Sequence, residues 1–155
     1  MTATLREMGE DEFAVFEARS IDSFSEDLAR AGSVPLDVAH AQAARQLAAL
    51  LPAGRATPGH HFENVIVEGR LVGQLWIGPH PEQADAAFVY DIVIHESERG
   101  QGFGRAAMRA AEQLARQEGF AAIGLSVFGD NAGAKRLYRS LGYEVVATSM
   151  LKRLD

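Results

Sequence analysis

The sequence predicts a single α/β domain in which a mixed β-sheet is flanked by helices on both faces. Three observations predict this class. The 155 residues fit one domain of ordinary size, residues 1–155. Segments with apolar residues at helical spacing alternate with short apolar segments typical of strands. The expected order of elements, β-α-α-β-β-β-α-β-α-β, is typical of strands and helices that pack in layers.

The N-terminal part supplies one strand and two helices. A weak alternation predicts a strand over Thr2 to Glu7. After Gly9, apolar residues recur every three or four positions, as on one face of a helix, and Gly32 ends this helix. A second, alanine-rich helix is expected from Pro35 to about Leu51, because proline is favoured at helix starts and Pro52 cannot continue the helix.

Three strands are expected in the middle of the chain. A hairpin has its strands at Asn64 to Val67 and Leu71 to Ile77, around the turn Glu68-Gly69-Arg70. After a loop from Gly78 to Asp85, nearly continuous apolar residues over Ala86 to Ile94 predict a strand covered on both faces.

The remaining residues predict two more helices and two more strands. A helix of about Arg105 to Glu118 has an apolar face and is followed by a buried strand, Ala121 to Phe128. Asn131 to Leu141 is a short helix, and Tyr143 to Leu151 is the expected final strand.

Composition excludes several classes of function. The net charge of -6 argues against a nucleic-acid partner. It would suit a cationic substrate, but net charge reports solubility better than it reports partners, and a modest acidic balance also keeps a protein soluble. The absence of cysteine excludes thiolate chemistry, and the five histidines lack metal-ligand spacing, so no metal is expected. No segment resembles a leader or a membrane span, so we expect a cytoplasmic protein without a membrane partner.

A glycine-rich turn, Arg99 to Arg105, is the most informative segment. It alternates three glycines with other residues, directly after the predicted strand Ala86 to Ile94 and directly before a helix. Glycine permits positive φ and leaves no Cβ to hold off a ligand, so several backbone N–H groups can converge on an anion. The helix dipole adds to this attraction. The turn therefore predicts a phosphate or pyrophosphate site, the alternative being a tight turn without a ligand.

The turn also matches the dinucleotide-binding fingerprint, as G-x-G-x-x-A from Gly102 to Ala107. That fingerprint belongs after the first strand and needs an acid about twenty residues on, where this chain has Ser126-Val127-Phe128. No Gly-Lys-Ser/Thr sequence is present, so a Walker-type loop is absent. A nucleotide-binding module remains an alternative function.

Two segments resemble motifs of the GNAT superfamily. The segment R-x-x-G-x-G at residues 99–104 resembles the pyrophosphate-binding motif of that family, Q/R-x-x-G-x-G/A. The segment N-x-x-A-x-x-x-Y-x-x-x-G-Y at residues 131–143 resembles its other recurrent segment, and a helix and a strand separate the two, as in the family. The resemblance implies an N-acetyltransferase that moves an acetyl group from acetyl-CoA to a primary amine by direct transfer in a ternary complex. An acyl-CoA sensor without catalysis is the alternative.

The resemblance also implies binding roles. Backbone N–H groups from Gln101 to Gly104 would hold the CoA pyrophosphate. Ile92 and Ile94 would pair with the pantetheine arm, because the family's fourth strand bulges and splays from the fifth. A backbone N–H near Val93 or Ile94 would stabilise the tetrahedral oxyanion. The residues expected to contact the cofactor are Ile92, Val93, Ile94, Arg99, Gly100, Gln101, Gly102, Phe103, Gly104, Arg105, Asn131 and Lys135.

Some of these residues have plainer interpretations. Asn131 resembles the family residue that bonds pantetheine, and it is equally a helix N-cap. Arg99, Arg105 and Lys135 are candidates for CoA phosphate contacts or solvated charges.

Tyr138 resembles the family's general acid. A thiolate leaving group, with a pKa near 8.5, benefits from a phenol with a pKa near 10 that donates a proton. The alternative is that Tyr138 only packs beside Leu137 and Leu141.

The attacking amine requires a base or a water relay, because an amine with a pKa near 10.4 is mostly protonated. Asp91 is the favoured base, since a carboxylate inside an apolar strand can have a raised pKa. The other candidates are Glu63, Glu26, Asp22, His61, His95 and Glu96. The sequence leaves open whether the acceptor is a small-molecule amine or a peptide or protein amine, and a homodimer is a reasonable expectation.

Overall fold

The computed structural model describes residues 1–154, and its elements follow the predicted order as far as the last helix. In chain order they are β1 (Thr4–Glu7), α1 (Glu10–Gly32), α2 (Leu36–Leu50), β2 (His61–Val67), β3 (Arg70–Pro79), β4 (Ala86–Ile94), α3 (Phe103–Gln117), β5 (Ala122–Leu125) and α4 (Ala132–Ser140). Short 3-10 turns lie at Gly54–Ala56 and Glu96–Glu98.

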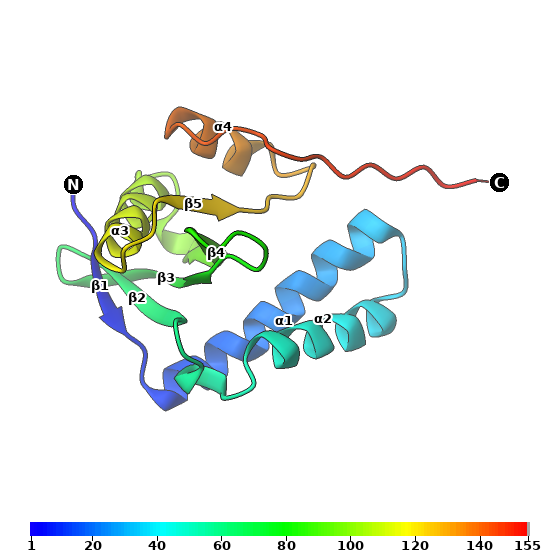
Figure 1. The fold of residues 1–155 in the computed structure, drawn as a ribbon, viewed down its shortest axis with the longest axis horizontal. Helices are drawn as coiled ribbons and strands as arrows, with labels where there is room; N and C mark the ends of the chain where they lie inside the picture. The colour runs from blue at the N-terminus through cyan, green and yellow to red at the C-terminus, as the bar shows by residue number, and fades with distance from the viewer. Residues whose placement is uncertain (155) are drawn as a thin grey trace.

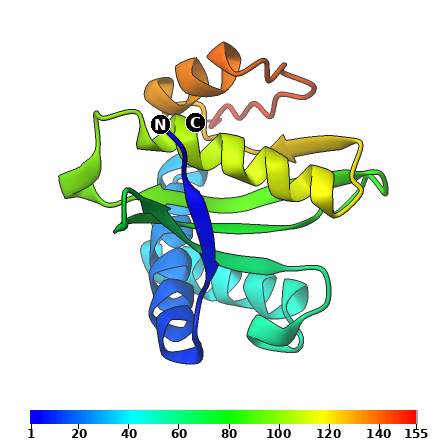
Figure 2. The same ribbon diagram turned by 90° about the vertical axis from the view of Figure 1, so that its left-hand side faces the viewer.

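One mixed sheet organises the molecule. Its strand order is β1-β2-β3-β4-β5, with antiparallel pairs from β1 to β4 and a parallel pair between β4 and β5. The pair α1–α2 covers one face of the sheet and α3 covers the other (Figures 1 and 2). The predicted fold class is confirmed: helices lie on both faces of a mixed sheet.

Each face of the sheet has its own apolar core. On one face, β-strand residues such as Val65 and Leu75 pack with Met108 and Ala111 of α3. On the other face, an aromatic cluster joins the helix α1 to the sheet. It comprises Phe13, Phe16, Phe62 and Trp76, with Met8 and Leu51. Because strand side chains alternate between faces, β2 and β3 contribute to both cores.

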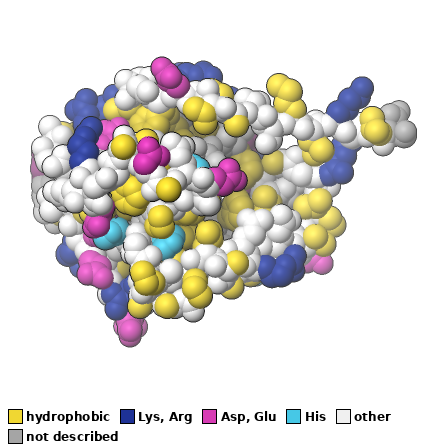
Figure 3. All heavy atoms as spheres, in the orientation of Figure 1, with side chains coloured by type: hydrophobic (Ala, Val, Ile, Leu, Met, Phe, Trp, Pro, Cys, Tyr) yellow, Lys and Arg dark blue, Asp and Glu magenta, His cyan; other side chains and the backbone are white. Residues whose placement is uncertain are grey.

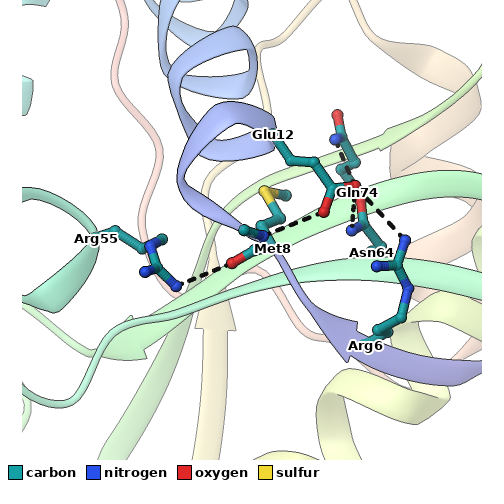
Figure 4. A network of polar contacts seen from close by, with 7 residues as sticks. Arg6, Met8, Glu12, Arg55, Asn64 and Gln74 are labelled. Atoms are coloured by element: carbon teal, nitrogen blue, oxygen red, sulfur yellow. Dashed lines mark hydrogen bonds and ion pairs between the residues drawn. The ribbon is translucent and has the colours of Figure 1, made fainter.

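A polar network fixes the start of α1 against the sheet (Figure 4). The Glu12 carboxylate accepts hydrogen bonds from the Gly9 N–H at 3.1 Å and from Asn64 Nδ2 at 2.9 Å, and it pairs with Arg6. Asn64 is fully buried and its Oδ1 accepts a bond from Gln74 Nε2. Buried amides must be satisfied in this way, so the network fixes the position of α1 on the sheet.

The hairpin between β2 and β3 is tighter than predicted. Its loop is the pair Glu68-Gly69, with φ of 51° and 77°, and Arg70 already belongs to β3. Positive φ at both central residues is the geometry that matches the right-handed twist of paired strands.

The predicted final strand, Tyr143 to Leu151, is wrong. The chain after Gly142 forms no helix or strand within the described residues, and it runs away from the sheet (Figure 1). Its β-prone residues have no strand edge beside them in this arrangement, and a strand forms only when its backbone has a partner. Because no strand follows it in the sheet, β5 is an edge strand and its side chains are at most half-buried. The sequence predicts a longer, buried strand over Ala121 to Phe128.

Candidate active site

β4 and β5 are paired for only part of their length. Their register runs from Ala86 opposite Ala122 to Val89 opposite Leu125, and no further. At this point β4 bulges. Trp76 of β3 lies opposite Asp91 and the next residue, Ile77, lies opposite Val89, so Tyr90 has no partner on β3. A bulge bends a strand and leaves backbone groups unpaired. The second half of β4 thus has no strand on its β5 side within residues 1–154.

A cleft of about 590 Å³ opens where the two strands separate. Its walls come from α1, α2, β4, the end of β5 and α4, and the surface is hollowed between α4 and the α1–α2 pair (Figure 3). The polar groups that border it include Ser20, Asp27, Asp91, Arg99, Asn131 and Tyr138. Its aromatic side chains are Phe24, Trp76, Phe88, Tyr90 and Phe128. A concave site with a few convergent polar groups suits a small ligand.

Asp91 is the carboxylate that the bulge of β4 directs into the cleft. Ser20 of α1 donates a hydrogen bond from Oγ to Asp91 Oδ2 at 2.5 Å. Burial raises the pKa of Asp91, and the Ser20 bond and the positive charge of Arg19 oppose this rise. A carboxylate with a raised pKa is a better proton acceptor than an exposed one.

Tyr138 of α4 borders the same cleft. Burial raises the pKa of its phenol above 10, and the negative charge of Asp91 raises it further. The phenol therefore holds its proton at neutral pH and is available as a donor. Its ring packs edge-on against Tyr143, with centroids 5.9 Å apart, which orients the side chain.

The glycine turn lies between β4 and α3, as predicted. Gly100 and Gly102 have φ of 77° and 84°, and Gly102 is the N-cap of α3. Arg99 Nε donates to the carbonyl of Ile94 at 3.0 Å and so closes the turn. A Cβ at Gly100 would meet no atom within 4 Å, so the space beside the turn is open. N–H groups in the first turn of a helix have no intrahelical partner and can bind an anion here.

The other predicted cofactor residues already make contacts within the protein. Asn131 caps α4: its Oδ1 accepts from the Ala134 N–H at 3.1 Å. The cap uses only Oδ1, and Asn131 borders the cleft, so its Nδ2 can still donate to a ligand. Lys135 Nζ donates to the Gly129 carbonyl, and Arg105 bonds Ser140 on α4.

Of the candidate bases, Asp91 alone borders the cleft. His61 and Glu63 lie on the face of the sheet that α3 covers, away from the cleft. Their side chains alternate along β2 with that of Asn64, which contacts Glu12 of α1. His61 also pairs with Glu118 at the end of α3. Asp22 contacts His40 of α2. Glu26, His95 and Glu96 do not border the cleft either.

Sequence reasoning missed Ser20 and Asp27, which α1 brings to the cleft. A signal for Ser20 was present, because it shares the helical spacing of Phe13 and Phe16, which both pack on the sheet. Asp27 shares this spacing as well, since it follows Ser20 by seven residues on the same helix.

Residues 1–154 contain no group of three or more His, Cys, Asp or Glu side chains placed to hold a metal ion. The same residues include no helix long and apolar enough to cross a membrane.

Known proteins resemble this chain in sequence and in fold. The model of the acetyltransferase (GNAT) family matches residues 21–143. The chain is 33% identical to the uncharacterized N-acetyltransferase YycN of Bacillus subtilis, over 99% of this chain and all of YycN. The crystal structure of YycN superimposes with a TM-score of 0.91 over 99% of each chain, at 32% identity. A second uncharacterized N-acetyltransferase of the same organism, YdgE, is 30% identical over 99% of both chains.

Proposed function

The chain belongs to the acetyltransferase (GNAT) family, and on this premise we propose that it moves an acetyl group from acetyl-CoA to a primary amine. The observation that carries the proposal is the divergence of β4 from β5 beside the glycine turn. It leaves an open strand edge next to the glycine turn, and the two features together suit an extended amide-containing chain that ends in a diphosphate.

The donor would be held largely by backbone groups. N–H groups from Gln101 to Gly104 would bind the diphosphate, because the glycines keep side chains out of the turn. The free edge of β4 from Ile92 to Ile94 would pair with the amides of the pantetheine arm, as a strand pairs with a strand. Asn131 Nδ2 would donate to the same arm from the other wall.

The transfer needs two proton movements, and the cleft offers a group for each. The acceptor ammonium would lose a proton to Asp91, directly or through water. The neutral nitrogen would then bond to the acetyl carbon as the carbon–sulfur bond breaks. Tyr138 would give its proton to the departing sulfur and recover one from the new amide nitrogen. Backbone N–H groups near Val93 and Ile94 would stabilise the carbonyl oxygen.

The cleft favours an amine carried on an apolar body. Asp27 and Asp91 attract a cation, while Trp76 and Tyr90 stack at 4.7 Å and form an aromatic wall. Aromatic faces and carboxylates together are suited to ammonium groups with hydrophobic substituents.

Two measurements on the purified chain test the proposal. Acetyl-CoA at saturation is expected to raise the unfolding temperature, and thiol release is expected with at least one member of a panel of arylalkylamines, polyamines and peptides. Absence of any thermal shift would overturn the proposal. Stabilisation without thiol release across the panel would favour the alternative of an acyl-CoA sensor.

A further inference from the structure

The segment Glu144–Leu154 is an exposed strand-like arm. Every residue in it is exposed, and it projects from the body of the molecule (Figures 1 and 3). Its large apolar side chains are Val145, Val146, Met150, Leu151 and Leu154, with Val146 96% and Met150 91% exposed. An apolar arm of this kind normally has a partner, because isolated exposed apolar clusters are rare on soluble proteins.

The base of the arm is firmly anchored. The Tyr143 N–H donates to the Tyr138 carbonyl at 3.0 Å, and the Tyr143 hydroxyl donates to Glu112 of α3 at 3.1 Å. The arm therefore leaves the body at a defined place, close to the end of α4, and its direction away from β5 is set there (Figure 1).

The sheet lacks a strand at the corresponding place. β5 lies at the end of the strand order and pairs only with β4, so its outer edge has no strand within residues 1–154. The sequence of β5, Ala-Ile-Gly-Leu, has no charge or proline to prevent pairing. An apolar edge strand without such protection is a template for another strand.

We propose that Glu144–Leu154 of one copy adds as a strand to the outer edge of β5 in a second copy, and that the exchange is reciprocal. At about 3.3 Å per residue the extended arm reaches roughly 36 Å, enough to cross onto a neighbouring molecule. A two-fold exchange satisfies both arms and both edges and closes the assembly. Leu125 and the residues after it border the cleft, so the arm of the partner would lie beside the cleft wall.

Cross-linking distinguishes this exchange from an arm that folds onto its own β5. The chain contains no cysteine, so any disulfide comes from introduced residues. Ala122→Cys is refolded together with a second variant that carries cysteine at one of the positions 145 to 148. We expect a disulfide between the two chains, identified by peptide mass. Ala122→Cys mixed with Val15→Cys, an exposed valine of α1, is the control and should give none.

A second measurement needs no cross-link. Sedimentation should give twice the chain mass of 16.7 kDa. Val146→Pro, which removes a backbone donor and breaks strand pairing, should shift the mass to that of one chain, while Val146→Thr should keep the dimer. A monomeric wild-type protein, the absence of a disulfide between position 122 and the arm, or a dimer unaffected by Val146→Pro would each overturn the proposal. None of these readouts depends on acetyl transfer.

Discussion

At the scale of single residues, Tyr138 and Tyr143 form a matched pair of phenols. Both are partly buried and their rings touch, but only Tyr138 borders the cleft, while the Tyr143 hydroxyl bonds Glu112. We expect Tyr138→Phe to lower kcat by about 100-fold, because it removes the proposed proton donor for the sulfur, and to leave the KM for acetyl-CoA nearly unchanged.

Tyr143→Phe is the control for that change. It should cost about 1 kcal/mol of stability through the lost hydrogen bond, and it should leave kcat near the wild-type value. Steady-state kinetics and urea unfolding of both variants measure the two effects. Equal kcat losses in both would show that Tyr138 has only a packing role.

Ser20 tunes the basicity of Asp91. Its hydroxyl donates to the carboxylate and so opposes the rise in the pKa of Asp91 that burial causes. Ser20→Ala should raise that pKa further, so the fall of kcat on the acid side moves to higher pH while kcat at high pH is kept. Ser23→Ala, at another serine that borders the cleft, should leave the pH profile in place. An unmoved acid limb in Ser20→Ala would exclude Asp91 as the base.

Glu63 lies outside the cleft, and its shifted pKa makes the free energy of unfolding depend on pH. Burial, and then repulsion from Glu7, raises its pKa from 4.5 to about 7. Below pH 4.5 the folded and unfolded chains both hold this proton. Between 4.5 and about 7 the folded chain holds more of it, so the free energy of unfolding falls as pH rises through this window.

Glu63→Gln should remove this loss, so that its stability gain over the wild type is larger at pH 8 than at pH 4. Urea unfolding at the two pH values measures it, with the exposed Glu82→Gln as the control. A gain of equal size at both pH values would contradict the shifted pKa.

At the scale of elements, a matched pair of glycines separates the effect of the turn between β4 and α3 on ligand binding from the effect of backbone strain on stability. Gly102 and Gly119 have φ of 84° and 88° at the two ends of α3, and a Cβ added to either would have no protein atom closer than 4.0 Å. Alanine at either position should lower the free energy of unfolding by about 1 kcal/mol, because an L-residue is strained at positive φ.

Only Gly102→Ala should weaken CoA binding, by about tenfold or more, since its methyl group would occupy the proposed diphosphate site. Gly119→Ala should bind CoA as the wild type does. Isothermal titration of the two variants makes the comparison, and equal affinities would remove the turn from the binding site.

The elements up to α4 were predictable because local signals mark them. Proline and glycine punctuate the helices, and the bounds of β4 were predicted to the residue. Tyr143 to Leu151 shows where such signals fail. Its β-branched residues favour a strand locally, but a strand also needs a free edge, and the direction in which the chain leaves α4 decides whether one is available.

At the scale of the whole molecule, the cleft is made by contacts between distant parts of the chain. Ser20 and Asp91 are 71 residues apart and meet only because α1 crosses the sheet over β4. No local pattern carries that pairing, which explains why the sequence placed Asp91 among seven candidate bases. Alternation along β2 was the one signal that could have removed His61 and Glu63 from that set.

The central claim is that the open edge of β4 and the adjoining turn hold acetyl-CoA. A crystal structure of the chain with coenzyme A tests it most directly. We expect the diphosphate within hydrogen-bonding distance of the N–H groups from Gln101 to Gly104, and the pantetheine arm beside Ile92 to Ile94. Coenzyme A bound elsewhere, with the turn free of phosphate, would contradict the account.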